Sequence, residues 1–390
     1  MADLVIAHIS DTHLGYRAYF RSDADGRNLR SLDVDDAYSA VVDDVIRHGD
    51  IDLILHSGDV FHQSRPTWSA IRCFIEHTRR LEQLGVPIIV IAGNHDTAQL
   101  RTSNTVFSVL ELALPKVQFV ASHEERAFDL EDLGLNVVAV PHGRLVSGPL
   151  ADIPLRTDRR NILVTHGLAP TLAESPRHEI GETVLDQKLL STGFDAILLG
   201  HFHKRMQVNS NTWYAGSSER IGWNDEDTRP GWSVVRMPAD DAPTAAERPI
   251  HTRQMITLGA YDGEGQTARQ ISDGVLKTAE AFAQPGAMVR VELLNVERAE
   301  RRSAEAMIRR EAGAKFLVLQ PYSRQDNTAL FNEEVRLDDS LRMKGIADLF
   351  TDFCAEQPYD EGFRGRFLER GRAAIETAIR NAEASVGDSE

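Results

Sequence analysis

Short apolar runs alternate with helical segments along about the first 200 residues of the chain. Six of these runs have the aliphatic and β-branched content of buried strands. They are Leu4–Ile9, Ile51–Leu55, Pro87–Ile91, Val137–Val140, Asn161–Val164 and Ala196–Leu199. Apolar positions from Trp68 to Leu84 recur at helical spacing, and Gly85 is suited to end that helix. The alternation predicts an α/β or sandwich core.

The pattern changes after Met237. Residues 238–244 form a predicted turn between two strands, the second of which runs through Arg248 to Ile256. A helix, a strand, a helix and a strand then follow, over Thr267–Phe282, Met288–Leu294, Ala304–Ala312 and Phe316–Leu319. A polar connector leads to helical stretches at about 339–355 and 361–386. We therefore expect three parts, at residues 1–258, 259–322 and 323–390.

The composition limits the kinds of site that this chain can build. With 390 residues and 42% hydrophobic content, it is long enough for well-packed cores. Two cysteines far apart in sequence, Cys73 and Cys354, exclude a disulfide framework and a thiolate metal site. The net charge of −16 argues against a broad DNA-binding surface. The first residues include an acid, lack the basic residues of a signal peptide and form an apolar run too short to cross a membrane. We therefore expect a cytoplasmic protein.

Five polar clusters follow the apolar runs and carry the chemistry. They are Asp11-Thr12-His13, Gly58-Asp59-Val60-Phe61-His62, Gly93-Asn94-His95-Asp96, Thr165-His166-Gly167 and Gly200-His201-Phe202-His203. Residues two apart on an extended chain point the same way, so Asp11 and His13 are expected to reach one cation. The two oxygens of Asp59 suit a bridge between two ions. Histidine and carboxylate ligands at strand ends predict a site for two divalent ions such as manganese.

This series of motifs resembles the calcineurin-like metallophosphoesterase superfamily. Three segments resemble its SbcD-type DNA double-strand-break repair nucleases, namely His8–Gly15, Gly58–His62 and Tyr214–Ile221 followed by Pro230-Gly231-Trp232. The strand from Met288 to Leu293 with its helix resembles their capping domain, whereas Ser218 stands where that family usually has proline. The resemblance implies a four-layer β-sandwich core flanked by helices, a small α+β capping domain and a C-terminal helical tail.

The resemblance also implies a role for each site residue. One metal would be held by Asp11, His13, Asp59 and His203, and the other by Asp59, Asn94, His166 and His201. The ions would be two Mn²⁺, with Mg²⁺ as a possible substitute. His95 would stabilise the developing charge and protonate the leaving 3′ oxygen, and His62 would contact the phosphate. Asp96 is either the partner that orients His95 or a plain helix N-cap.

Three further segments leave a binding role and a structural role open. The run from Tyr16 through Arg17 and Tyr19 to Arg21 interleaves aromatic and basic residues, which suits DNA, but nearby aspartates make an ordinary solvated loop equally acceptable. Lys204 and Arg205 directly follow His203 and are placed to meet a phosphate or solvent. The arginines of residues 298–310 could line a DNA groove, but they alternate with glutamates, which favours a salt-bridged exposed helix.

The expected activity is two-metal hydrolysis of DNA phosphodiester bonds. Its rivals are a phosphodiesterase for small substrates such as cyclic nucleotides and a non-catalytic metal-binding scaffold. An apolar stripe in the tail, at Phe363, Phe367, Ile375 and Ile379, favours docking over packing on its own body. From the resemblance we expect an SMC-like ATPase as its partner, a homodimer, and a nucleoid-associated location without membrane contact.

Overall fold

The chain is described by a computed structural model that covers residues 2–97, 105–121, 123–148, 153–172 and 182–322, with 351, 362 and 365–372. It separates into two units. The first comprises Met1–Gly259, Gln266–Val291 and Arg298–Gln320, and the second comprises Ala260–Gly265, Glu292–Glu297 and Pro321–Glu390. Of the apolar stripe expected in the tail, only Phe367 lies among the described residues. No helix in the described ranges is both long and apolar enough to cross a bilayer.

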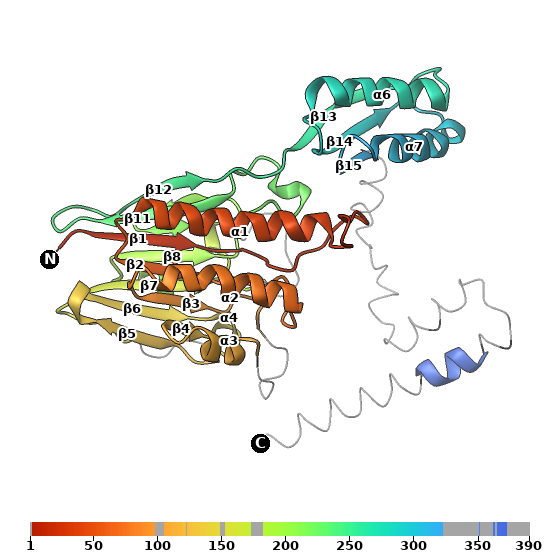
Figure 1. The fold of residues 1–390 in the computed structure, drawn as a ribbon. Coiled ribbons are helices and arrows are strands. Elements are labelled where there is room, and N and C mark those ends of the chain that lie inside the picture. Colours follow the sequence, from red (N-terminus) through yellow and green to blue (C-terminus); the bar gives the residue numbers. More distant parts are fainter. Residues whose placement is uncertain are drawn as a thin grey trace. The chain divides into compact units, whose positions relative to one another are not determined.

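Two six-stranded sheets form the core of the first unit (Figure 1). The first has the order β12-β11-β1-β2-β3-β4, with strands Thr244–Pro249, Gly231–Met237, Leu4–Ile9, Leu53–His56, Ile88–Ile91 and Val117–Val120. The second has the order β5-β6-β7-β8-β10-β9, with strands Arg126–Leu130, Leu135–Val140, Arg160–His166, Ala196–Gly200, Thr212–Tyr214 and Met206–Asn209. Strands β1 to β4 pair in parallel, as do β6, β7 and β8.

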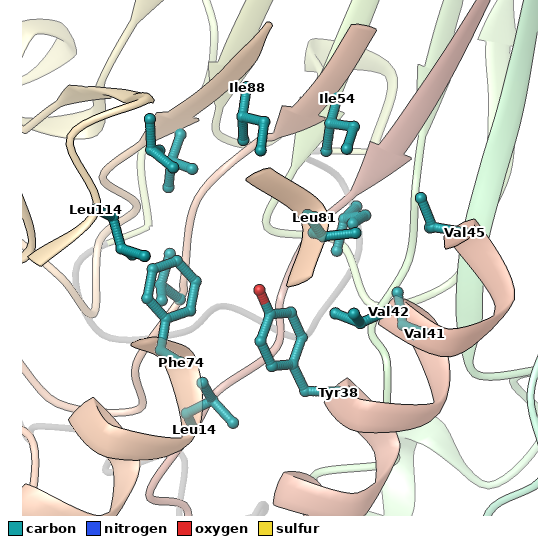
Figure 2. Close-up of a cluster of buried hydrophobic side chains, with 14 of the residues drawn as sticks. Leu14, Tyr38, Val41, Val42, Val45, Ile54, Phe74, Leu81, Ile88 and Leu114 are labelled. Carbon is teal, nitrogen blue, oxygen red and sulfur yellow. The ribbon is translucent and has the colours of Figure 1, made fainter. Parts of the chain in front are cut away.

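Three clusters of buried side chains define the layers. Ile6 and Leu55 of the first sheet pack with Val164 and Leu198 of the second, so the two sheets lie face to face. The outer face of the first sheet is covered by α1 (Leu29–His48), α2 (Trp68–Glu82) and α3 (Phe107–Ala113). Figure 2 shows this packing, with Tyr38 of α1 and Phe74 of α2 lying below the strands that carry Ile54 and Ile88.

The outer face of the second sheet packs against α5 (Gln187–Ser191), where Leu189 and Leu190 contact Leu163 and Ile197. The order of layers is therefore helix, sheet, sheet, helix. This confirms the four-layer sandwich that the resemblance implies. Short helical turns complete the core, at η1 (Glu131–Leu133), α4 (His142–Leu145), η2 (Pro170–Leu172) and η3 (Trp223–Asp225).

The six predicted strands all form, and the predicted helix α2 begins at Trp68, where the Thr67 side chain accepts a hydrogen bond from the amide of Ala70. Helix α1 was not predicted. Its N-cap Asn28 accepts from the amides of Arg30 and Ser31, and its buried face carries Val34, Tyr38 and Val45. Strands β4, β5, β9 and β10 were also not predicted, since they are short and three of them lie at sheet edges.

The strand predicted to run from Arg248 to Ile256 is wrong. Strand β12 ends at Pro249, and a new strand, β13 (Met255–Asp262), begins in a different sheet. The break occurs because β12 pairs with β11, whereas β13 pairs with β14. In the segment between β12 and β13, Arg253 donates two hydrogen bonds to the carboxylate of Asp33.

The third sheet has the order β13-β14-β15, with β14 at Met288–Leu294 and β15 at Val318–Tyr322. Helices α6 (Ala268–Phe282) and α7 (Arg298–Ala312) pack against each other beside it (Figure 1). We call these five elements the small module. Helix α7 begins six residues earlier than the Ala304 that the apolar pattern predicts, because its first turns are polar. Its Arg309 and Glu305 form the expected i,i+4 ion pair on an exposed face.

Candidate metal centre

Two backbone turns beyond the carboxyl ends of β1 and β2 run side by side. The amide of Asp11 donates to the carbonyl of Gly58 at 3.0 Å, and the amide of His13 donates to the carbonyl of Asp59 at 3.0 Å. Asp11, His13 and Asp59 have positive φ values of 50°, 45° and 53°. Side chains other than glycine seldom adopt this conformation, and it concentrates at functional sites. The convergence expected from an extended chain is therefore achieved by left-handed turns instead.

Glycines in the motifs leave room for these turns. A Cβ atom on Gly93 would lie 2.2 Å from Oδ1 of Asp59, and one on Gly200 would lie 2.1 Å from the carbonyl oxygen of Ser57. Gly58 combines a φ of 98° with a hypothetical Cβ only 2.5 Å from Nδ1 of His166. Any side chain at these positions would push the ligand groups apart.

Asp11, His13 and His203 form the first group of candidate ligands, with their ligand atoms all within 4.8 Å of one another. The Nε2 atoms of His13 and His203 are 3.0 Å apart, and Nε2 of His13 lies 3.8 Å from Oδ2 of Asp59. Two nitrogens each about 2.1 Å from one ion at a right angle would be roughly 3 Å apart. The spacing of the two imidazoles therefore fits a shared cation.

Asp59, His166 and His201 form the second group within the same limit. Oδ1 of Asn94 lies 2.9 Å from Nε2 of His166 and 3.2 Å from Nδ1 of His201. Oδ2 of Asp59 lies 3.3 Å from Nε2 of His166. Since Oδ2 of Asp59 also faces His13, this carboxylate lies between the two groups. The structure thus brings all seven predicted metal ligands together.

Each of three histidines is held from behind by an acceptor. Nδ1 of His166 donates to the carbonyl of Ser57 at 2.8 Å, and Nδ1 of His203 donates to Oδ2 of Asp225 at 2.9 Å. Nε2 of His201 lies 3.3 Å from Oε2 of Glu182. Such partners set the tautomer, so that the opposite nitrogen presents its lone pair to a metal.

Sequence reasoning missed both Asp225 and Glu182. Asp225 stands in an acidic run that looks like ordinary solvated surface, 22 residues from the histidine that it holds. No apolar strand precedes either residue, so no sequence signal separates them from other acids. Their role becomes visible only when the turn at η3 and the segment before β8 are placed against Gly200-His201-Phe202-His203.

The buried charges also suit divalent ions. Burial alone would raise the pKa of Asp59, but the charge and hydrogen bond of His166, with His13 and His95, hold this pKa well below its usual value. Burial lowers the pKa of His166, and the carboxylates of Asp59 and Asp11 outweigh it and raise the pKa to about 9. Burial keeps the pKa of His13 well below 6.5. Two buried carboxylates, several imidazoles and an amide oxygen form a donor set for a borderline or hard cation, which would take the place of the proton on His166.

His95 lies at the edge of this cluster. Its amide donates to Oδ1 of Asp59 at 2.9 Å, and its Nδ1 donates to the carbonyl of His62 at 2.8 Å. The rings of His62 and His95 are stacked with centroids 5.1 Å apart, and His13, His62 and His95 form a third group of close ligand atoms. The hydrogen bond to His62 places a ring proton on Nδ1, so in the neutral ring Nε2 carries the lone pair.

Asp96 connects two of the turns that carry the site, a role not expected from the sequence. Its buried carboxylate accepts hydrogen bonds from the amides of Val60, Phe61 and Gly93, at 3.0, 2.9 and 3.1 Å. Burial and the nearby charge of Asp59 raise its pKa to about 7. Asp96 therefore ties the turn after β2 to the turn after β3, while the carbonyl of His62 orients His95.

The residues expected to contact DNA fall into two classes. Arg17 and Lys204 are exposed, and Lys204 pairs with Asp227 at 2.8 Å. The Tyr16 ring lies edge-on to His62, with centroids 4.9 Å apart, and is half-buried.

Three others are used within the protein. Tyr19 packs with Met255 and Met288, and Arg21 donates to the carbonyl of Gly313 at the end of α7. The guanidinium of Arg205 donates to the carbonyl of Ala215 at 2.8 Å, and burial lowers its pKa to about 10. These contacts give each of the three side chains a structural role within the protein.

Comparisons with known proteins identify a matching family and several relatives. Residues 4–205, more than half of the chain, match the family described as calcineurin-like phosphoesterase. The chain is 29% identical over 286 residues to the DNA double-strand break repair protein Mre11 of Haloferax volcanii, covering 72% of this chain and 60% of that protein. Proteins of the same name from Saccharolobus solfataricus and Methanococcus maripaludis are 30% and 33% identical over 53% and 54% of this chain. The aligned part spans 51% and 56% of those two relatives.

Proposed function

The chain belongs to the calcineurin-like phosphoesterase family, and from this premise we propose that it is a metal-dependent nuclease that hydrolyses phosphodiester bonds in DNA. The observation that carries the proposal is the convergence of the predicted ligands on two groups with Asp59 between them, with His95 at their edge. The relatives named for DNA double-strand break repair support DNA as the substrate. Because the chain spans little more than half of their length, their full activity is a hypothesis for this protein.

The proposed ligand sets follow the two groups. Asp11, His13, Asp59 and His203 hold one ion, and Asp59, Asn94, His166 and His201 hold the other. We propose Mn²⁺ in both positions, with Mg²⁺ as a substitute. When bound, such a pair polarises the scissile phosphate and makes hydroxide available near neutral pH.

The protein's own residues then complete the reaction. His95, when protonated on both ring nitrogens, donates the proton on Nε2 to the leaving 3′ oxygen and becomes neutral, with its remaining proton on Nδ1. The carbonyl of His62 accepts the hydrogen bond from Nδ1 and so orients the ring for this transfer. The His62 ring, stacked on His95 and edge-on to Tyr16, contacts the phosphate. We propose that the exposed side chain of Arg17 neutralises backbone phosphates, and that Lys204 does so by exchanging its ion pair with Asp227 for a phosphate.

The decisive experiment incubates the purified full chain and Mn²⁺ with end-labelled single-stranded and duplex DNA, and in parallel with a cyclic nucleotide and bis(p-nitrophenyl) phosphate. We expect cleavage of DNA that EDTA abolishes and added Mn²⁺ restores. Asp11→Asn, which lies in a ligand set, serves as the inactive control. Cleavage of the small esters without any cleavage of DNA would make this chain a small-substrate phosphodiesterase. Binding of Mn²⁺ without any hydrolysis would make it a scaffold.

We also propose a homodimer that works in the cytoplasm at the nucleoid with an SMC-like ATPase bound through the tail. The support is the resemblance to nucleases that recruit such ATPases, together with the apolar stripe from Phe363 to Ile379, most of which lies outside the described residues. A chain ending at residue 322 should keep its metals and basal hydrolysis but lose ATP-stimulated cleavage of duplex DNA. Full-strength co-purification of the truncated chain with the ATPase would place the partner site elsewhere.

A further inference from the structure

A short acidic turn contacts both the metal centre and the small module. This turn, Trp223–Asp227, contains the 3-10 helix η3 and lies between β10 and β11 of the core. Three of its residues are consecutive acids, Asp225, Glu226 and Asp227. The three carboxylates make different contacts, so the turn is not simply the solvated acidic run that its composition suggests.

The inward contact is made by Asp225. Oδ2 of this buried carboxylate accepts hydrogen bonds from Nδ1 of His203 at 2.9 Å and from the amides of Ile221 and Gly222 at 2.9 and 3.2 Å. His203 is the only residue of the metal centre that Asp225 is shown to hold among the described contacts. The orientation of this imidazole therefore depends on where the turn places Asp225.

The outward contact is made by the next residue and by Trp223. The carboxylate of Glu226 accepts from the amide of Thr257 on β13 at 2.5 Å and from Nη2 of Arg290 on β14 at 3.2 Å. The same guanidinium lies over the Trp223 ring, 4.8 Å from its centroid, and donates to Oγ1 of Thr257 at 2.6 Å. Trp223 also packs against the cluster of Met255, Met288 and Leu317.

The turn is braced, so displacement at one contact reaches the other. Oγ1 of Thr228 donates to the carbonyl of Asp225 at 2.7 Å, and Nη2 of Arg220 donates to the carbonyl of Thr228 at 2.9 Å. Nη1 of Arg220 reaches Oγ1 of Thr252, in the segment that leads into β13, at 2.9 Å. Asp225 and Glu226 are adjacent in sequence. A shift of Glu226 with β13 and β14 therefore moves Asp225 unless the bracing breaks.

We propose that the acidic turn is a positioning device, in which Arg290 and Thr257 of the small module set the position of Asp225 through Glu226 and Trp223, and thereby orient His203 toward its metal. Arg290, Glu226 and Asp225 are positioning residues in this scheme, since they act through His203. The inference rests on the proposed metal-dependent function. It adds that the ion held by Asp11, His13 and His203 depends on contacts of the small module.

The test is the affinity of the full chain for Mn²⁺, measured by calorimetry on metal-depleted protein. Asp225→Asn should weaken one of the two sites about 10- to 100-fold, the usual effect of losing a partner behind a metal-bound histidine. Arg290→Gln removes the contacts of this side chain with Glu226, Thr257 and Trp223, and should weaken the same site about 2- to 30-fold. Because Arg290 acts through Asp225, the double variant should bind no more weakly than Asp225→Asn alone.

Two controls make the result specific. Arg269→Gln removes another arginine of the small module with its ion pairs to Asp273 and Glu311, away from the turn, and should leave both affinities unchanged. Arg290→Lys keeps a positive charge beside Glu226 and should recover part of the lost affinity. If Arg290→Gln fails to fold, as judged by thermal unfolding, Glu226→Gln breaks the same contact from the other side.

Unchanged affinity in Arg290→Gln and Glu226→Gln, or additive losses in the double variant, would overturn the coupling while leaving the proposed function intact. A wild-type chain that binds no Mn²⁺ would instead overturn the proposed function and, with it, the premise of the coupling. An equal loss in Arg269→Gln would show a general effect of the small module and would also reject the turn as the route.

Discussion

Two neighbouring segments of the chain differ in how well their sequence predicts their contacts. One is the turn that carries Asp11 and His13, and the other is the loop that carries Tyr19 and Arg21, only a few residues later. Asp11 and His13 lie in the metal centre, where the motif places them. Tyr19 and Arg21, which suit DNA as well as solvent, instead contact residues around the small module. The same stretch of chain thus contains one region that its local pattern determines and another that distant segments determine.

The difference lies in how the backbone is held. Strands β1 and β2 are parallel, with Ile9 opposite His56, so the residues that follow them emerge at one edge of the sheet. The turns beyond them remain paired by backbone hydrogen bonds as far as Leu14. After that point no sheet neighbour guides the loop. Arg21 bonds to Gly313, 292 residues away, and no local pattern indicates such a contact.

Among the residues that follow the strands, substitution of Asp59 should have the largest effect, because its carboxylate lies between the two ligand groups. Asp59→Ala should abolish binding of both ions and lower DNA hydrolysis by at least about three orders of magnitude, since the loss removes metal catalysis itself. Calorimetry with Mn²⁺ and cleavage of labelled DNA measure the two effects. Asp240→Asn, an exposed acid outside the ligand sets and the acidic turn, is the control for metal binding. Two ions bound as tightly as in the wild type would remove Asp59 from its bridging position.

A smaller effect is expected at His95, which lies in the same region but outside both proposed ligand sets. His95→Ala should lower turnover about 10²- to 10⁴-fold, the usual contribution of a general acid or base. Its backbone amide still donates to Asp59, so metal content should stay nearly unchanged. Metal analysis beside single-turnover kinetics separates the two outcomes. A fall in metal content that matches the fall in rate would make His95 a ligand.

Glu219 belongs to the region whose contacts only the tertiary structure determines, and it should make the stability of the chain depend on pH. It is buried near Arg30 at the start of α1, with 3.9 Å between the charged groups. Burial raises the pKa of Glu219 from 4.5 to about 7, partly offset by Arg30. The folded state therefore holds this proton more tightly than the unfolded state. Its contribution to stability is present below about pH 4.5 and is lost as the pH rises to about 7.

Glu219→Gln should remove this pH-dependent loss of stability. Compared with its effect at pH 4.5, the substitution should raise the free energy of unfolding of the metal-free chain at pH 7.5 by on the order of 3 kcal/mol. Arg30 keeps its ion pair with Asp33 at 2.6 Å, so the substitution does not leave a buried charge alone. Urea unfolding in EDTA at the two pH values measures the difference. Parallel pH profiles for the variant and the wild type would show that Glu219 is already ionised at neutral pH.

The smallest effects should distinguish Arg17 from Arg21 within one loop. Arg17→Ala should weaken DNA binding a few-fold and reduce the slope of log affinity against log salt by about 1, as expected for one lost phosphate contact. Arg21→Ala should instead lower the stability of the chain by about 1 kcal/mol, because it loses a hydrogen bond to Gly313. Salt titrations by fluorescence anisotropy and thermal unfolding measure both. A reduced salt slope in Arg21→Ala would return that residue to the DNA surface.

The sequence by itself determined the strands that carry the site and the identity of the metal-ligand candidates. Each of these strands is a mostly apolar run that a polar cluster closely follows, so burial and parallel pairing leave few alternatives. Helix α1 escaped prediction because its sequence mixes aspartates with the valines that face the sheet. The end of β12 at Pro249 was not predicted either. It marks a change of sheet, because β12 pairs with β11 whereas β13 pairs with β14, and these partner strands lie elsewhere in the chain.

Only the tertiary structure decided which polar side chains support the ligands. Asp225 behind His203 and Glu182 behind His201 come from segments without an apolar pattern, and Asp96 accepts three amides from two different turns. A carboxylate looks the same in sequence whether it faces water or a buried imidazole. Its role is set by the neighbours that the fold brings within about 3 Å, because hydrogen bonds and charge effects in a buried site act over that distance.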